Sequence, residues 1–290
     1  MTAIIFGAKG QDGIYLTQLL YEKKYTVITI NRDHAAVNNG VNNFENICAL
    51  VKKHQPEYIF HFAANSTTRH DAWQENHETI STGTLNILEA VRLHCQGAKI
   101  FLSGSGLQFK NENKPIKESD PFEAGSIYAV SRIHTVYTAR YYRSLGIKVY
   151  TGYFFTHDSP YRTERHINKK ILNTVKRIAA GSTEKLAIGD ISVKKEFGFA
   201  GDIVKGIWTL VTQDNVFETV IGTGVAHAIE EWLDICFSMY DLDSKKYVEP
   251  IPGFVPEYKV LVSDPATIFS LGWKPETDIY LLAKLMNTQS

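Results

Sequence analysis

The chain has 290 residues, of which 44% are hydrophobic and 21% charged, a composition that predicts a sizeable buried core and argues against intrinsic disorder. Lysine plus arginine and aspartate plus glutamate number 31 each, and this balance argues against a dedicated nucleic-acid-binding protein. No apolar run approaches the roughly 20 residues that span a bilayer, and the N-terminus lacks the features of a signal peptide. The three cysteines form no CxxC pair. We therefore expect a cytoplasmic protein with reduced thiols and neither a membrane nor a nucleic-acid partner.

Short apolar runs alternate with amphipathic stretches along the first half of the chain, which is typical of βαβ units and a parallel sheet. A helix is expected to begin near residue 14 and another to cover residues 84–91. The predicted strands are residues 3–6, 26–30, 58–62, 98–102 and 149–153. This pattern predicts an α/β fold built on a Rossmann-like, doubly wound parallel sheet.

Beyond about residue 155 the pattern changes, because charged, loop-like segments alternate with short helices and three prolines interrupt residues 250–256. We therefore predict a smaller, mixed α/β C-terminal lobe. The sheet domain comprises residues 1–155 and a return segment near 198–222. The lobe comprises residues 156–197 and 223–290, and we expect it to cover the carboxyl ends of the strands, where open α/β folds bind ligands.

A glycine-rich segment, Gly7-Ala8-Lys9-Gly10-Gln11-Asp12-Gly13, lies between the first predicted strand and the first helix. Its glycines permit a tight turn, and the backbone N–H groups at a helix N-terminus can hold a pyrophosphate. In this context the segment predicts dinucleotide binding by Gly7, Gly10, Gln11, Asp12 and Gly13.

The residues at the end of the second strand, Ile30-Asn31-Arg32-Asp33, bear on the choice of cofactor. Asn31 carries no charge, and Arg32 can pair with a 2′-phosphate, so NADP(H) is favoured. Asp33 leaves NAD(H) open, and a solvated loop arginine is the alternative interpretation of Arg32.

A candidate reaction centre combines Tyr128 and Arg132, four residues apart on one face of a predicted helix, with Ser105, which follows the strand that ends at Leu102. A tyrosine near its reference pKa of about 10 is a poor base, so a cation is needed to stabilise its phenolate. The alternative is a structural tyrosine whose hydroxyl is satisfied within the fold. His61, His157 and His166 lack the spacing of a metal site, so we expect no metal.

These residues stand in a chain that resembles, over nearly its whole length, the extended short-chain dehydrogenase/reductases, also described as the NAD-dependent epimerase/dehydratase family of nucleotide-sugar enzymes. Within that family the chain is most similar to the GDP-mannose 4,6-dehydratase branch. The segments that carry the resemblance include Gly10-Gln11-Asp12-Gly13, Phe62-Ala63-Ala64-Asn65-Ser66, Tyr128-Ala129-Val130, His157-Asp158-Ser159-Pro160, Gly189-Asp190-Ile191 and Leu271-Gly272-Trp273-Lys274-Pro275.

The resemblance implies hydride exchange between a nicotinamide and C4 of the sugar. Tyr128 would exchange a proton with the C4 oxygen, Ser105 would hydrogen-bond that oxygen, and Arg132 would take the place of the family's lysine. It also implies a homodimer or tetramer and a nucleotide-sugar substrate, with GDP favoured. Further residues implied at the cofactor are Ala63 and Ala64, and those implied at the substrate are Thr156, Arg162, Lys170 and Lys195. Solvated surface charge is the alternative for the lysines.

Two departures from the family pattern change the expected reaction. Arg132 is bulkier than the family's lysine and does not shed its proton. Leu107 stands where the dehydratases carry the glutamate that removes the C5 proton. The favoured hypothesis is therefore an NADP(H)-dependent 4-keto reductase of a GDP-linked deoxy sugar. The alternatives are a C4 epimerase or 4,6-dehydratase-like enzyme, and a catalytically silent NADP- and nucleotide-sugar-binding protein.

Overall fold

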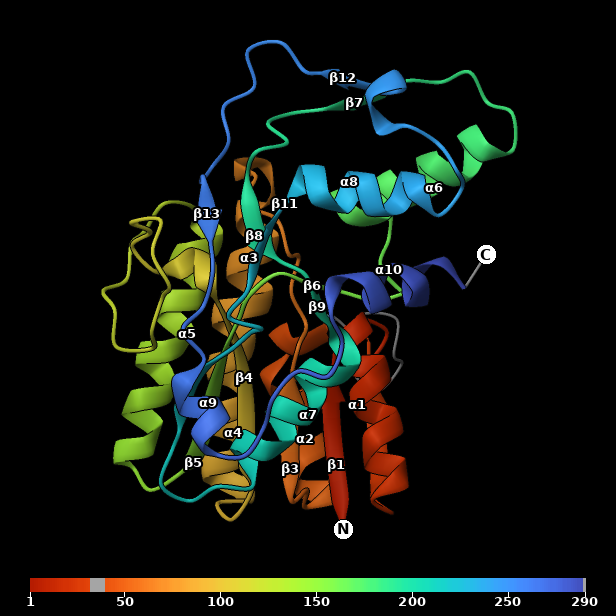
Figure 1. The fold of residues 1–290 in the computed structure, drawn as a ribbon. Coiled ribbons are helices and arrows are strands. Elements are labelled where there is room, and N and C mark those ends of the chain that lie inside the picture. Colours follow the sequence, from red (N-terminus) through yellow and green to blue (C-terminus); the bar gives the residue numbers. More distant parts are fainter. Residues whose placement is uncertain (32–39, 289–290) are drawn as a thin grey trace.

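The computed structural model describes residues 1–31 and 40–288 and contains a large, fully parallel sheet (Figure 1). Its strand order is β10-β5-β4-β3-β1-β2, so the order reverses between β1 and β3. The strands are β1 (Thr2–Phe6), β2 (Thr26–Ile30), β3 (Tyr58–His61), β4 (Lys99–Ser105), β5 (Lys148–Phe154) and β10 (Glu218–Ile221). In open α/β sheets, ligands bind beyond the carboxyl ends of the strands at this kind of reversal.

Helices cover both faces of this sheet, because alternate side chains of each buried strand point to opposite faces. Ile4 and Phe6 of β1 belong to the core beneath one set of helices, whereas Ala3 and Ile5 belong to the other. The first face is covered by α2 (Phe44–His54), α4 (Gly83–His94) and α5 (Ile127–Ser144), and the second by α1 (Gln11–Glu22), α7 (Ala200–Val211) and α9 (Ala266–Ser270).

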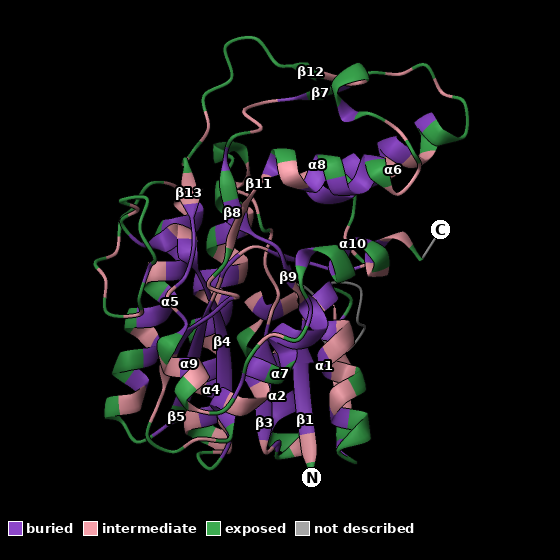
Figure 2. Ribbon diagram, in the orientation of Figure 1, coloured by how far each residue is buried: buried purple, intermediate pink, exposed green. Residues whose placement is uncertain are grey.

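A smaller lobe lies over the carboxyl ends of the strands (Figure 1). Its own core surrounds Trp232, which is fully buried. The helices of the lobe carry buried residues along part of their surface (Figure 2). The helices are α6 (Ile167–Ala179), α8 (Ile229–Ser238) and α10 (Ile279–Asn287). Its short strands are β6 (His157–Asp158), β7 (Leu186–Ile188), β8 (Lys194–Glu196), β9 (Gly198–Phe199), β11 (Ala226–Ala228), β12 (Val248–Pro250) and β13 (Val260–Leu261).

Several short helical segments shape the clefts at the sheet edge. Between β3 and α4 the chain forms the helix α3 (Trp73–Asn76) and then the π-helical segment η3 (His77–Thr82), an element that is rare and often found at functional sites. The 3-10 segments are η1 (Gly40–Asn42), η2 (His70–Ala72), η4 (Gly106–Gln108) and η5 (Ser244–Lys246).

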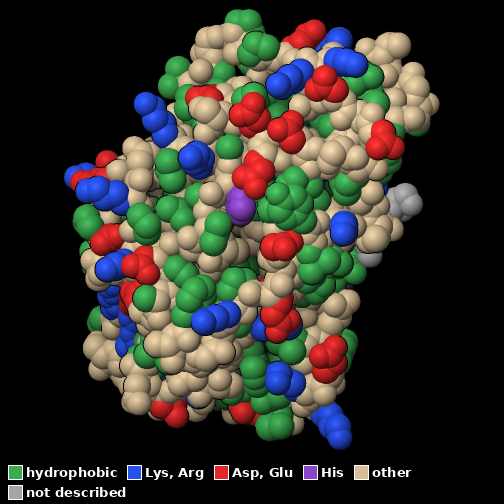
Figure 3. Space-filling model, in the orientation of Figure 1, with side chains coloured by type: hydrophobic (Ala, Val, Ile, Leu, Met, Phe, Trp, Pro, Cys, Tyr) green, Lys and Arg blue, Asp and Glu red, His purple; other side chains and the backbone are tan. Residues whose placement is uncertain are grey.

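The predicted fold class and the positions of the predicted strands are confirmed, with β4 extending through Ser105. None of the helices in the two described ranges combines the length and apolar character needed to cross a bilayer. Acidic and basic side chains are intermingled on the face that Figure 3 presents. Of the tyrosines at positions 137, 141 and 142, Tyr142 is buried and donates to Glu89, whereas Tyr137 and Tyr141 are exposed.

Candidate active site

The glycine-rich segment forms a tight turn in which two glycines have no room for a side chain. Gly7 has φ +85°, in the left-handed region, and a Cβ there would lie 2.6 Å from the backbone nitrogen of Ala63. A Cβ on Gly13 would lie 2.6 Å from the carbonyl oxygen of Gly7. The N-cap of α1, Gly10, supplies no side chain to cap the helix. The N–H groups of this helix end can therefore serve a phosphate, so the segment fits the dinucleotide that its sequence predicts.

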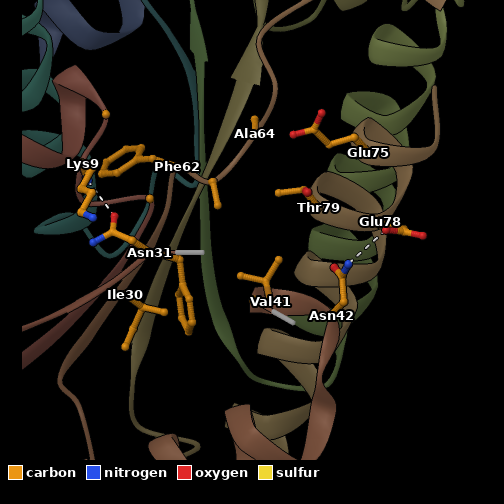
Figure 4. Close-up of a pocket in the computed structure, with 15 residues that line it drawn as sticks. Lys9, Ile30, Asn31, Val41, Asn42, Phe62, Ala64, Glu75, Glu78 and Thr79 are labelled. Carbon is orange, nitrogen blue, oxygen red and sulfur yellow. Dashed lines mark hydrogen bonds between the residues drawn. The ribbon is translucent and has the colours of Figure 1, made fainter. Parts of the chain in front are cut away.

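One cleft, with a volume of about 600 Å³, opens beside this turn (Figure 4). Asn31, Ala63 and Ala64, three of the residues predicted to contact a cofactor, line it. The Asn31 side-chain oxygen accepts a 2.8 Å hydrogen bond from the Lys9 backbone N–H and so ties the end of β2 to the glycine-rich turn. Arg32, the predicted partner of a 2′-phosphate, lies outside the described residues. The opposite wall is helical and presents Glu75, Glu78 and Thr79.

A second cleft, of about 710 Å³, continues from the first along the N-terminus of α1. Gly10 and Gly13 line it, and so do Arg162 and Arg165. Positive side chains and a helix N-terminus thus border the same cleft, an arrangement that suits a diphosphate. Arg162, predicted from the resemblance to contact substrate, lines both this cleft and the cavity that contains Tyr128.

Gln11 and Asp12 of the turn bind the second lobe. The Gln11 amide donates to the backbone oxygen of His157 at 3.1 Å and accepts from the Ser159 hydroxyl at 3.0 Å. Asp12 Oδ1 lies 2.9 Å from His157 Nε2, and His157 Nδ1 lies 2.8 Å from the carbonyl oxygen of Phe155. The side-chain amide of Gln11 is therefore hydrogen-bonded to the lobe, whereas its backbone N–H belongs to the N-terminus of α1.

Both ring nitrogens of His157 face acceptors, so the imidazolium form, with an N–H on each, satisfies both contacts. Burial lowers the pKa of His157, but the charge and hydrogen bond of Asp12 outweigh burial, and the pKa is raised above its usual value of 6.5. This buried pair joins the glycine-rich turn of the sheet domain to β6 of the lobe.

The predicted reaction-centre residues lie together in a third cavity, of about 220 Å³. Tyr128 and Arg132 belong to α5, Ser105 is the last residue of β4, and Leu107 is the second residue of η4. Thr156 lines the same cavity. Ser105 Oγ accepts from the Leu107 N–H at 3.2 Å, and within the described chain its own hydrogen has no acceptor. The hydroxyl of Tyr128 likewise bonds no described residue, unlike that of Tyr142, which donates to Glu89.

Arg132 is 5% exposed and is held by neutral groups. Its Nη1 donates to the backbone oxygen of Ser103 and, at 2.9 Å, to the Ser103 hydroxyl. The guanidinium carbon lies 5.2 Å from the centroid of the Tyr128 ring. No described carboxylate forms an ion pair with Arg132, and its hydrogen-bond acceptors are neutral.

A fourth cavity, of about 350 Å³, lies in the lobe and contains Lys170 and Lys195. Phe254 and Tyr258 also line it, and Tyr258 lines the reaction-centre cavity as well, so the two cavities share a wall. Lys195 is buried, with its ammonium 5.3 Å from the Phe197 ring, and burial lowers its pKa to about 8. Lys170 is exposed, and its Nζ is 3.5 Å from the backbone oxygen of Ala187.

A buried carboxylate forms an ion pair with Arg162 and lies near the charge of Lys195. Asp158, 2% exposed, accepts from Arg162 Nε at 3.1 Å and from Asn168 Nδ2 at 2.6 Å. The alternative interpretation of the lysines as solvated surface charge fits Lys170, which is exposed, but not Lys195, which is buried.

The sequence reasoning did not assign a role to three residues that line these cavities: His157, His166 and Tyr258. The resemblance had placed His157 in a matching segment, which is the one signal that pointed to it. His166 precedes α6 and lines both the second and third cavities. Burial and the nearby Arg162 charge lower the pKa of His166 to about 4.

Known proteins match this chain over nearly its whole length. A family model described as GDP-mannose 4,6 dehydratase matches residues 4–286. GDP-mannose 4,6 dehydratase 2 of Arabidopsis thaliana is 31% identical over 317 residues, which cover 98% of this chain and 85% of that protein.

Two solved structures share the fold. RMD from Pseudomonas aeruginosa, complexed with NADPH, has a TM-score of 0.84 at 18% identity and covers 99% of this chain and 96% of its own. UDP-glucose 4-epimerase from Thermus thermophilus, complexed with NAD, has a TM-score of 0.80 at 18% identity and covers 100% of both chains. Because the family model extends over almost the whole chain, the protein belongs to the GDP-mannose 4,6-dehydratase family of nucleotide-sugar enzymes.

Proposed function

We propose that the protein is an NADP(H)-dependent reductase of the 4-keto group of a GDP-linked deoxy sugar. The observation that carries this proposal is the composition of the reaction-centre cavity. Its described lining contains one carboxylate, Asp12, which is paired with His157, and it contains Leu107 where an elimination would need a base. Reduction requires a proton donor, a hydrogen-bond donor and a cation, and Tyr128, Ser105 and Arg132 suit these roles.

In the proposed reaction, Tyr128 donates its hydroxyl proton to the C4 oxygen of the sugar while Ser105 donates a hydrogen bond to the same oxygen. When bound, the nicotinamide supplies the hydride that reduces the C4 carbon. The phenolate left on Tyr128 is stabilised by the unpaired charge of Arg132, and a proton from solvent restores the hydroxyl. Carbonyl, hydride and proton together give the C4 alcohol, so no base at C5 is required.

The turn at Gly7, Gly10 and Gly13 would hold the cofactor's pyrophosphate, and the cleft at Asn31 and Ala63 would hold its adenosine. The absence of an acidic side chain at position 31 supports NADP(H), and the NADPH complex of the similarly folded RMD is in line with this choice. NAD(H) stays the alternative, as in the epimerase complex. The diphosphate of the substrate would meet Lys195 and Lys170, whose cavity adjoins the reaction centre.

A C4 epimerase is the second candidate, since the same three residues would serve a hydride that is returned to the opposite face of the sugar. Tight, copurifying cofactor favours the epimerase, whereas freely exchanging cofactor favours the reductase. A catalytically silent binding protein is the third candidate, which is less well supported because the hydroxyl of Tyr128 and the hydrogen of Ser105 Oγ bond no described residue and can serve a reacting oxygen.

We also propose that two copies of the chain associate through α4 and α5. Val130, Tyr137 and Tyr141 are 42%, 58% and 60% exposed and recur at helical spacing on α5. Leu85 and Leu93 of α4 are 44% and 48% exposed. Light scattering of the purified protein is expected to give a dimer or tetramer, and a monomer would contradict this part of the proposal.

The reductase proposal is tested by mixing purified protein, NADPH and a GDP-4-keto-6-deoxy-hexose and following NADPH absorbance. We expect consumption that Tyr128→Phe lowers by about 10²–10⁴-fold, since the variant keeps the ring and removes the proton donor. Incubation with GDP-mannose and NADP⁺ is the counterpart measurement. Sustained formation of the 4-keto product there would contradict the proposal, because it would require the C5 base that Leu107 cannot provide.

A further inference from the structure

Two buried polar atoms beside the reaction centre have no partner among the described protein groups. One is Nδ1 of His61, at the end of β3, and the other is Nε of Arg132, on α5. The two residues are 3% and 5% exposed. Buried polar atoms are nearly always hydrogen-bonded to protein or to an ordered water, so this pair calls for a physical explanation.

The two atoms are complementary in hydrogen bonding. His61 Nε2 lies 3.1 Å from the backbone oxygen of Thr79 in η3. A carbonyl oxygen can only accept, so the proton of the neutral ring is on Nε2 and Nδ1 presents a lone pair. Burial and the adjacent Arg132 charge lower the pKa of His61 to about 3, which keeps the ring neutral. Nε of Arg132 always carries a hydrogen, so one atom is an acceptor and the other a donor.

Ser103 hydrogen-bonds to both residues. Its hydroxyl accepts from Arg132 Nη1 at 2.9 Å and donates to the backbone oxygen of His61 at 3.2 Å. β3 and β4 are adjacent in the sheet, so His61 and Ser103 are near neighbours at its carboxyl edge. Ser103 therefore binds the guanidinium and the backbone of His61, while Thr79 holds the imidazole through Nε2, and a single water can bridge a donor and an acceptor held on adjacent strand ends.

We propose that His61 is a positioning residue for Arg132, with its Nδ1 lone pair receiving the guanidinium Nε–H through one buried water. The acceptors of Nη1 and Nε are then all neutral: a backbone oxygen, a hydroxyl, and a water whose own hydrogen is accepted by the imidazole nitrogen. A carboxylate in the place of His61 would hold the guanidinium equally well but would neutralise its charge. The neutral imidazole orients the cation and leaves its charge for the oxygen of Tyr128.

The kinetic test rests on the proposed reductase activity and compares His61→Phe in two backgrounds. Phenylalanine fills the ring volume but has no lone pair, so in the native background we expect NADPH oxidation to fall by up to about 100-fold, as misplacement of a catalytic group does. In an Arg132→Lys background there is no Nε–H to position, and the loss is expected to be at least about tenfold smaller. Equal losses in both backgrounds would overturn the proposal, because they would show that His61 acts only through the fold.

A second readout needs no activity. In ¹⁵N NMR of histidine-labelled protein near neutral pH, we expect His61 to carry its proton on Nε2 alone and its Nδ1 resonance to shift when Arg132 is replaced by lysine. A ring protonated on Nδ1, or an Nδ1 resonance that the replacement leaves unchanged, would overturn the inference. If the protein fails to oxidise NADPH but the NMR result holds, the reductase proposal fails and the positioning of Arg132 stands.

Discussion

Replacing Asp12 by asparagine tests whether a buried ion pair joins the glycine-rich turn to the lobe. His157 is 6% exposed and its Nε2 lies 2.9 Å from Asp12 Oδ1. A hydrogen bond to a charged group contributes about 1.5–3 kcal/mol, and asparagine keeps the shape of the side chain but not its charge. We therefore expect Asp12→Asn to lower the free energy of unfolding by about 2 kcal/mol near pH 6.

The pH dependence of this loss is the sharper part of the prediction. Because the pKa of His157 is raised in the folded protein, the stabilisation is complete below the unfolded value of 6.5 and is lost as the pH rises through the folded value. Urea unfolding near pH 6 and near pH 9 is expected to give a smaller difference between native and variant proteins at the higher pH. Asp71→Asn, in an exposed pair with Arg69, is the matched control and should change little at either pH. A difference for Asp12→Asn that is the same at both pH values would refute the reasoning.

Three further predictions concern charge and backbone geometry. Because the pKa of Lys195 is about 8, kcat/KM for the nucleotide sugar should fall as the pH rises above that value. Lys195→Arg should remove the fall, since arginine stays protonated. A pH profile of kcat/KM that is the same in native protein and Lys195→Arg would contradict a role of Lys195 in substrate binding. Asp158→Asn should destabilise the fold by about 3–5 kcal/mol in urea unfolding, because the buried Lys195 and the partly buried Arg162 lose the carboxylate that offsets their charge. A loss below about 1 kcal/mol would be inconsistent with this role. Gly7→Ala should abolish cofactor binding, measured by NADPH fluorescence, because its Cβ would lie 2.6 Å from the Ala63 nitrogen. The control Gly10→Ala should fold, because the closest contact of its Cβ would be 3.3 Å. Normal NADPH binding by Gly7→Ala would contradict the close packing at that glycine.

The parts of the site that could be predicted from the sequence are those written in short stretches of chain. The spacing of Gly7, Gly10 and Gly13 after an apolar run specifies a strand, a turn and a helix N-terminus, and the structure has all three. Tyr128 and Arg132 share a helical face because they are four residues apart, and both line one cavity.

The parts that could not be predicted depend on packing between distant segments. Asp12 and His157 are 145 residues apart, and no local pattern indicates that they meet. Lys194 and Lys195 look alike in the sequence, yet Lys195 is buried and lines the lobe cavity, whereas Lys194 is exposed, and this difference is set by the segments that pack around β8. The anchoring of Arg132 on Ser103 likewise requires α5 to pack against the end of β4.

Reduction of the C4 carbonyl of a nucleotide sugar with a proton from Tyr128 is tested most directly by supplying NADPH that carries deuterium on its transferable position. The substrate is a GDP-4-keto-6-deoxy-hexose, and NMR locates the label in the product. We expect net NADPH consumption with deuterium at C4 of the sugar, and loss of both in Tyr128→Phe. NADPH consumption without label at C4, or transfer that Tyr128→Phe leaves unchanged, would contradict it.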